Sequence, residues 1–130
     1  MLLSLFILSN LLHAFALEQP NCFTTPKILV DVSNSLSEPL LLRCKSGDTD
    51  LQYHILQTRG HFSWSFCVNF PRTTLFTCDL KTTTRKASFK AYEAGLEESC
   101  KNKKCLWTAR DDGIYLYQFK FYNWSPLSRA

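Results

Sequence analysis

The segment from His61 to Phe70 constrains the fold of this chain most strongly, because apolar and polar residues alternate along it without a break. Successive side chains of a β-strand point to opposite faces, so the segment predicts a half-buried strand. A helix would scatter the apolar side chains around its circumference. One face of the predicted strand therefore carries an apolar, mostly aromatic stripe facing a core: Phe62, Trp64, Phe66, Val68 and Phe70.

Seven further segments have the short length and the β-branched or aromatic composition that are typical of strands. They are residues 27–32, 40–44, 53–57, 73–79, 87–92, 105–109 and 114–122. Residues 81–86 are expected to be an exposed loop, and residues 93–104 a long loop with one helical turn around 94–99. The pattern predicts an all-β fold, a small disulfide-bonded antiparallel β-sandwich of about eight strands.

The first 16 residues form a segment of a different kind. Residues 2–12 are almost entirely apolar but too short to span a bilayer, and they lead into Ala14-Phe15-Ala16, a pattern that signal peptidase accepts. We therefore predict a signal peptide over residues 1–16 and a single secreted, extracellular domain over residues 17–130. A membrane anchor is the alternative interpretation of the first segment.

Six cysteines follow the predicted cleavage site: Cys22, Cys44, Cys67, Cys78, Cys100 and Cys105. An even number in a small secreted domain predicts three disulfides, each contributing about 2–4 kcal/mol to stability. The residues alone do not reveal the pairing. Paired cysteines also argue against a free catalytic thiol.

Two histidines of the predicted mature chain, His54 and His61, are the candidates for catalysis. Such a pair can act as general acid and base in an RNA-cleaving site. No recognisable catalytic motif surrounds them, so the expectation is that the protein has no catalytic residues and is not an enzyme. A secreted hydrolase or ribonuclease that uses His54 and His61 is kept as the alternative.

Metal and cofactor sites are not expected. The spacing of Cys100 and Cys105 suits half of a zinc site, but the second half is missing. Asp48 and Asp50 resemble a fragment of a calcium loop without the glycine and glutamate that complete one. Asn123-Trp124-Ser125 is a candidate N-glycosylation sequon, although the proline that follows lowers its expected use.

The formal net charge of +4 is only a mild basic bias. Such a surface is usually a solvated one, and nucleic-acid binding is not expected; affinity for acidic polymers or anionic lipid stays an open alternative. A membrane-active defence protein is the third functional class considered. It would need an exposed amphipathic surface, which the strand pattern does not supply, so no stable membrane insertion is expected.

Several motifs occur together and in a fixed order along the chain. They are Ile28-Leu-Val-Asp-Val-Ser-Asn-Ser-Leu36, Leu42-Arg-Cys-Lys-Ser46 followed by Asp50-Leu51 and His54, Phe62-Ser-Trp-Ser-Phe66, Thr74-Leu-Phe-Thr-Cys78, Cys100 to Cys105 with Trp107, and Asp112-Gly-Ile-Tyr115. This combination resembles the plant self-incompatibility protein S1 family, the S-protein homologues, over roughly residues 27–122. Gln52 departs from the family pattern, which commonly has glycine there, and Thr77 stands where an aromatic residue often precedes the cysteine.

The resemblance implies a small secreted β-sandwich that acts outside the cell as a signalling or recognition ligand. In the poppy case this is the pistil determinant that halts incompatible pollen through a membrane receptor. Four cysteines, at positions 44, 78, 100 and 105, match the usual family set. Cys22 and Cys67 are additional, and they would bond to each other if the other four pair among themselves.

By the same resemblance, the expected partner is a cell-surface receptor or another extracellular protein, bound by a monomer of this chain. The expected contact surface comprises the 45–50 loop with the neighbouring 81–86 and 101–104 loops. Its candidate residues are Lys45, Asp48, Asp50, Arg85, Lys86, Lys101, Lys103 and Lys104.

Overall fold

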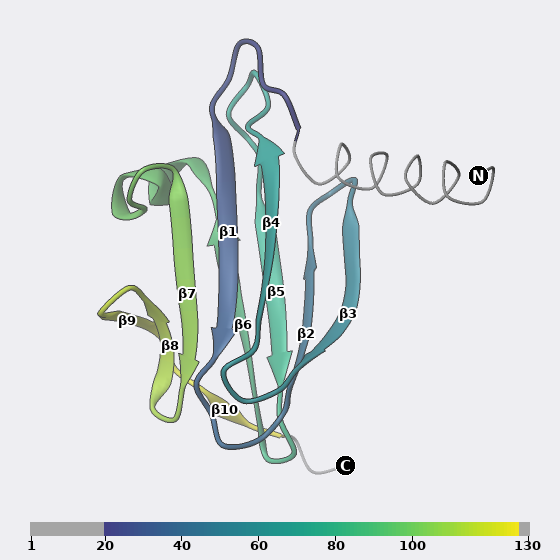
Figure 1. Ribbon diagram of the computed structural model, residues 1–130, viewed down its shortest axis with the longest axis vertical. Helices are drawn as coiled ribbons and strands as arrows, with labels where there is room; N and C mark the ends of the chain where they lie inside the picture. The colour runs from purple at the N-terminus through teal and green to yellow at the C-terminus, as the bar shows by residue number, and fades with distance from the viewer. Residues whose placement is uncertain (1–19, 128–130) are drawn as a thin grey trace, which may run out of the picture.

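The computed structural model describes residues 20–127, which form two five-stranded sheets packed face to face (Figure 1). The predicted signal peptide and its cleavage site lie outside the described residues. Among residues 20–127, no helix has both the length and the apolar character needed to cross a bilayer.

The first sheet has the strand order β4-β1-β7-β8-β9. Its strands are β4 (His61–Cys67), β1 (Lys27–Asn34), β7 (Lys104–Arg110), β8 (Gly113–Leu116) and β9 (Phe119–Tyr122). Strand β1 runs antiparallel to β4 and parallel to β7. The central strand therefore joins two segments that are far apart in the sequence.

The second sheet has the order β10-β6-β5-β2-β3, and its neighbouring strands are antiparallel. Its strands are β10 (Ser125–Pro126), β6 (Arg85–Tyr92), β5 (Phe76–Lys81), β2 (Leu40–Lys45) and β3 (Asp50–Leu56). A short 3-10 helix, η1 (Ala94–Ser99), connects β6 to β7 and occupies the position of the predicted helical turn. The predicted disulfide-bonded β-sandwich is confirmed.

The described residues form ten strands rather than about eight, because the segment predicted as one strand over 114–122 turns back on itself to give β8 and β9, and the unpredicted short strand β10 follows. Tyr117 has a left-handed backbone (φ 53°), and β8 and β9 pair on either side of that turn. Ile114 and Leu116 are buried, whereas Phe119 remains 63% exposed. The expectation of one continuous strand over this segment was wrong.

Other strand boundaries moved by a few residues. Strand β3 begins at Asp50, earlier than predicted, and β5 begins at Phe76, later than predicted. The segment 81–86 is not a loop throughout, because Lys81 ends β5, Arg85 begins β6 and Thr82 is buried. Only the hairpin turn between these two strands is irregular.

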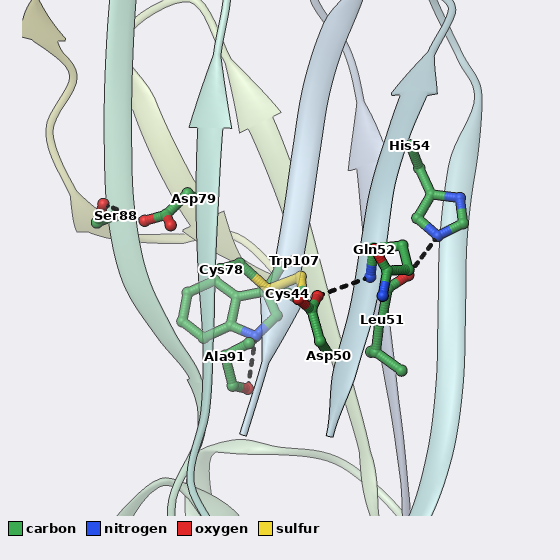
Figure 2. The surroundings of a disulfide bond; sticks show 10 residues. All are labelled: Cys44, Asp50, Leu51, Gln52, His54, Cys78, Asp79, Ser88, Ala91 and Trp107. Atoms are coloured by element: carbon green, nitrogen blue, oxygen red, sulfur yellow. Dashed lines mark hydrogen bonds between the residues drawn. A yellow bond between two sulfur atoms is a disulfide. The ribbon is translucent and has the colours of Figure 1, made fainter. Parts of the chain in front are cut away.

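The core lies between the two sheets and consists of the inward residues of every second position. In β1 these residues are Ile28, Val30 and Val32, which are fully buried. Trp107 is fully buried as well, and its Nε1 donates a hydrogen bond to the carbonyl of Ala91 at 3.0 Å (Figure 2). A buried indole whose N–H is paired stabilises the contact between the sheets without leaving a polar atom unsatisfied.

The predicted aromatic stripe is confirmed over most of its length and fails at its end. Trp64 and Val68 are buried, and the Trp64 ring lies 5.6 Å from that of Phe76 in the opposite sheet. Phe70 is 86% exposed. Strand β4 ends at Cys67, and the hydrogen bond from Arg72 N to the Asn69 carbonyl (3.0 Å) closes a turn that carries Phe70 out of the core.

The six cysteines form three disulfides, Cys22–Cys67, Cys44–Cys78 and Cys100–Cys105, so none is free. This confirms the predicted three bonds and the pairing of Cys22 with Cys67. Cys44 and Cys78 are buried register partners on β2 and β5, and Figure 2 shows the disulfide between them. The Cys22–Cys67 bond holds the N-terminal arm, the Cys44–Cys78 bond joins β2 and β5 in the core, and the Cys100–Cys105 bond closes a short loop.

Removing the Cys44–Cys78 disulfide should cost more stability than removing the Cys100–Cys105 disulfide, which closes a shorter loop. The Cys44–Cys78 bond closes a loop of 34 residues and the Cys100–Cys105 bond a loop of 5 residues. Loop-closure entropy assigns these bonds about 4 and about 2 kcal/mol, respectively. Urea unfolding of the two double alanine variants measures the difference. An equal or larger loss for Cys100→Ala/Cys105→Ala would contradict this ranking.

Trp64→Ala should lower the free energy of unfolding by about 3–5 kcal/mol, because it empties the space between Phe62 and Phe76. Trp64→Phe should cost less, roughly 1–2 kcal/mol, since Nε1 of Trp64 is buried with no hydrogen-bond partner among the described residues. Trp107→Phe is the matched comparison and should cost more than Trp64→Phe, because it removes a buried hydrogen bond to the Ala91 carbonyl. Chemical denaturation of the three variants decides the order.

Candidate functional site

The 101–104 loop is a short basic hairpin with a tightly held backbone. Its flanking residues, Cys100 and Cys105, are joined by a disulfide with a Cα–Cα distance of 4.7 Å. Lys101 and Lys104 exchange backbone hydrogen bonds of 3.1 and 2.9 Å. Asn102 and Lys103 have left-handed backbones (φ 52° and 60°), as the central residues of a type I′ hairpin turn require.

Tyr117 holds this hairpin from the neighbouring β8–β9 turn. Its hydroxyl accepts a hydrogen bond from Lys101 N at 3.0 Å and donates one to the Lys104 carbonyl. The Lys101 ammonium lies 4.7 Å from the centre of the Tyr117 ring, within the range of a cation–π contact. Lys103 is exposed, as are Lys101 and Lys104, so the hairpin presents three cations on a rigid backbone.

The 45–50 loop is stabilised by its own polar side chains. Ser46 N donates to the Thr49 carbonyl at 2.8 Å, and the Ser46 hydroxyl donates to Asp48 Oδ1 at 3.0 Å. Asp48 is therefore engaged inside the loop although it is exposed. Lys45, the last residue of β2, is exposed beside it. This loop offers a partner one free cation and a partly occupied carboxylate.

Asp50 is committed to contacts within the protein. Its carboxylate forms an ion pair with Arg43, which also lies 4.8 Å from the centre of the Tyr53 ring. Asp50 Oδ1 accepts a hydrogen bond from Gln52 N at 2.9 Å (Figure 2). The Arg43 hydrogen bond first, and the Gln52 N–H second, lower the pKa of Asp50 to about 2. The Gln52 bond also helps hold a left-handed backbone (φ 68°), the conformation that glycine adopts at lowest cost.

The 81–86 segment does not neighbour the other two loops, which corrects the expectation of one three-loop surface. Lys45 pairs with Thr77 at the start of β5, whereas Lys81 pairs with Leu41 and Lys86 at the other end of that sheet (Figure 1). Lys86 is exposed there.

Arg85 has internal partners at this far end. Its guanidinium donates to Asp111 Oδ1 at 3.0 Å and lies 4.9 Å from the centre of the Trp124 ring. These contacts tie β6 to the segment that leads into β10. Arg85 therefore has a structural task in addition to any contact with a partner.

The 45–50 and 101–104 loops lie at the same end of the sandwich, the upper end in Figure 1. Lys104 is in register with Leu29 near the start of β1, and Lys27 is in register with Cys67 at the end of β4. Cys67 and Lys45 both line an open hollow at this end of about 650 Å³. We call this end, comprising the 20–26 arm and the 45–50, 68–75 and 101–104 segments, the loop end.

The hollow was not predicted from the sequence. Its apolar floor includes Phe66 and Phe76, whose ring centres are 4.6 Å apart, and its rim includes polar residues of the 45–49 and 73–77 segments. Leu75 contributes a partly exposed apolar side chain. The lining of the hollow comes from the ends of β2, β4 and β5 and the loops beside them, which are far apart in the sequence, so no local motif could have signalled it.

The two candidate catalytic histidines point to different places. The His54 ring stacks on Phe62 with ring centres 4.0 Å apart, and its Nε2 donates to the Leu51 carbonyl at 2.8 Å (Figure 2). His61 precedes Phe62 on β4 and so points to the opposite face of that strand. There its Nδ1 lies 2.7 Å from Asp31 Oδ1. The geometry does not bring the two imidazoles to one substrate.

Other candidate sites have structural explanations or remain predictions. Cys100 and Cys105 are bonded to each other, so they are not a half-site for zinc. In the described part of the chain no three His, Cys, Asp or Glu side chains form a group that could hold a metal ion. Asn123 is exposed between β9 and β10, and its glycosylation remains a prediction.

The fold and the three disulfides define a small cystine-bonded β-sandwich. The family model described as "Plant self-incompatibility protein S1" matches residues 29–126. S-protein homolog 6 of Arabidopsis thaliana is 38% identical over 93 residues, which cover 71% of this chain and 68% of that protein. The chain belongs to the plant self-incompatibility protein S1 family.

Two further relatives extend the comparison. S-protein homolog 24 of Arabidopsis thaliana is 38% identical over 103 residues, covering 73% of this chain and 67% of that protein. Self-incompatibility protein S1 of Papaver rhoeas is 27% identical over 124 residues, covering 94% of this chain and 89% of that protein.

A solved structure agrees with the observed fold. It is described as that of SPH (self-incompatibility protein homologue) proteins, a widespread family of small, highly stable, secreted proteins from plants. The TM-score is 0.57 at 20% identity, over 84% of this chain and 92% of that one. This likeness concerns the arrangement of the two sheets.

The Asp50 ion pair should make stability depend on pH in the acidic range. The carboxyl titrates near about 3.9 in an unfolded chain, and its pKa in the folded protein is about 2. The unfolded state therefore binds the proton first, so this contribution is present above about pH 4 and is lost as the pH falls through about 2. Asp50→Asn should make the decline in melting temperature between these pH values shallower. Arg43→Met should have the same effect, and an unchanged slope in both variants would contradict the assignment.

Proposed function

We propose that this protein is a secreted plant recognition ligand that binds a cell-surface partner through the loop end of its β-sandwich. Membership of the self-incompatibility family supports an extracellular recognition role, and three disulfides suit an oxidising compartment. The observation that carries the proposal is the rigid basic hairpin over residues 101–104. In this proposal the protein acts as a monomer and needs neither a cofactor nor a catalytic step.

The hairpin is suited to recognition because its charges are positioned before a partner arrives. The Cys100–Cys105 bond and the Tyr117 hydroxyl restrict the backbone, so binding loses little conformational entropy there. The three ammonium groups are exposed and contribute little to the stability of the fold. Substitutions of these side chains can therefore change a partner without changing the scaffold.

Electrostatics supports an acidic surface on the partner. Lys101, Lys103 and Lys104 lie within one four-residue loop, and Lys45 and Lys27 are exposed at the same end. Exposed cations at the rim of an interface accelerate the encounter with an acidic patch more than they slow dissociation. The expected kinetic signature is an association rate that falls with increasing salt.

Charge reversal of the hairpin tests this proposal. The triple variant Lys101→Glu/Lys103→Glu/Lys104→Glu should bind protoplasts with association about tenfold slower at low salt, while its circular dichroism and melting temperature stay close to wild type. The matched control is Arg59→Glu/Lys81→Glu/Lys86→Glu, which makes the same change in net charge at exposed positions of the opposite end. It should bind like the wild type.

The outcomes separate a specific loop from a general charge effect. Equal loss of binding in both triple variants would show that net charge governs binding, and would contradict the assignment to the hairpin. Binding that is unaltered in the hairpin variant would also contradict it. Reduced binding in the hairpin variant alone, with the fold intact, supports the proposal.

A further inference from the structure

Two phenylalanine side chains at the loop end lie almost entirely in solvent. Phe23, in the N-terminal arm, is 95% exposed, and Phe70, after β4, is 86% exposed. These are the highest exposed fractions among the large apolar side chains of residues 20–127. Single exposed apolar residues are common on proteins, but two such rings at one end of a small domain indicate a surface that is covered in use.

The Cys22–Cys67 disulfide brings these two rings to the same end. Phe23 directly follows Cys22, and Phe70 lies three residues after Cys67. The Cα–Cα distance across the bond is 5.5 Å, so the Cα atoms of Phe23 and Phe70 are within roughly 20 Å of each other. Both segments lie at the upper end of Figure 1, and Val68 N donates to the Pro26 carbonyl at 3.0 Å between them.

The turn that carries Phe70 is a built feature of the fold. Asn69 Oδ1 accepts a hydrogen bond from Thr73 N at 2.7 Å, and the Asn69 carbonyl accepts one from Arg72 N at 3.0 Å. The Arg72 guanidinium forms an ion pair with Glu97 of η1 at 2.7 Å. These contacts hold Phe70 outward, away from the apolar core beside it.

Exposed basic side chains lie at the same end of the sandwich as the two rings. Five exposed lysines belong to the loop end or its border: Lys27, Lys45, Lys101, Lys103 and Lys104. Among the carboxylates at this end, Glu97 pairs with Arg72 and Asp50 with Arg43, whereas Asp48 is exposed and accepts a hydrogen bond from Ser46. The loop end therefore combines projecting aromatic rings with an excess of positive charge.

We propose that the loop end docks peripherally on an anionic lipid surface, with Phe23 and Phe70 inserted at the level of the headgroups and the lysines near the phosphates. Amphipathic surfaces bind membranes by this combination of shallow apolar burial and attraction to acidic lipids. Docking of this kind needs no membrane-spanning segment. It goes beyond the proposed recognition function and does not require a receptor.

The arrangement favours a lipid surface over an apolar pocket on a protein. Polar residues lie close to each ring in the sequence, Asn21 and Thr24 around Phe23 and Asn69 and Thr73 around Phe70, although Cys22 and Pro71 are direct neighbours as well. The rings therefore project singly instead of forming the continuous apolar centre that is typical of a protein interface. A bilayer interface accepts separate rings with polar neighbours, because water and headgroups satisfy the polar groups around them.

Vesicle co-sedimentation with the predicted mature chain tests the proposal. Wild type should bind vesicles of phosphatidylcholine with about 30 mol% phosphatidylserine, bind phosphatidylcholine alone less tightly, and lose affinity as salt rises. Phe23→Ser and Phe70→Ser should each lower the partition coefficient about tenfold, since each removes one inserted ring. Both side chains are exposed, so the melting temperature should remain near that of the wild type.

Ile55→Ser is the matched control, because Ile55 is a large apolar side chain that is 66% exposed near the opposite end of β3. It should bind vesicles like the wild type. A second measurement uses the tryptophan fluorescence of Phe70→Trp, from which the wild-type signal is subtracted. On addition of anionic vesicles this emission should shift to the blue, and brominated lipid should quench it. Both results support insertion of this end.

Three results would overturn the proposal. The first is a wild-type protein that does not bind the anionic vesicles, and the second is equal binding by the wild type and both serine variants. The third is that neither the wild type nor the serine variants bind vesicles while the serine variants lose binding to protoplasts. That result would assign the rings to a protein partner. Since the vesicles contain no receptor, failure here leaves the charge-reversal test of the hairpin unaffected.

Discussion

The position of β1 between β4 and β7 is the constraint on which the rest of the structure depends. Its inward side chains are fully buried between the two sheets, and its edges are hydrogen-bonded to strands that follow it by some 30 and 75 residues. This pairing places Lys27 beside Cys67 and Leu29 beside Lys104. The N-terminal arm, the β4–β5 connection and the basic hairpin meet at one end because they all adjoin the start of β1.

At the loop end, internal contacts occupy some polar groups and leave others free. Asp50 is held by Arg43, and Asp48 by Ser46, so neither carboxylate is fully available to a partner. The lysines of the 101–104 hairpin differ, because disulfide and tyrosine contacts restrict their backbone and leave the ammonium groups exposed. A rigid backbone with free cations is what a recognition loop needs, since the order is already present before binding.

The candidate partner-binding residues could be found from the composition of the sequence, but which of them lie together on one surface could not. Lysines between two cysteines predicted an anchored basic loop, which the structure contains. The 81–86 segment was grouped with it, but the antiparallel register of β2 and β5 puts that hairpin at the far end. Phe70 was placed in the core because the alternation continues through it, whereas hydrogen bonds around Asn69 interrupt the strand. Whether a segment continues as a strand or forms a local turn depends on its hydrogen bonds to neighbouring segments. The alternation of apolar and polar residues gives no information about those bonds.

The sequence by itself determined the elements with strong local signals: the aromatic stripe up to Val68, most of the strands, the β-sandwich class and the three disulfides. These follow from side-chain alternation, turn chemistry and cysteine parity, which are properties of neighbouring residues or of composition. Only the tertiary structure decided the division of residues 114–122 into two strands, the separation of His54 from His61, the hollow and the exposure of Phe70. Each of these depends on which distant strands pair and in what register, because burial between two sheets is shared by residues far apart in the chain.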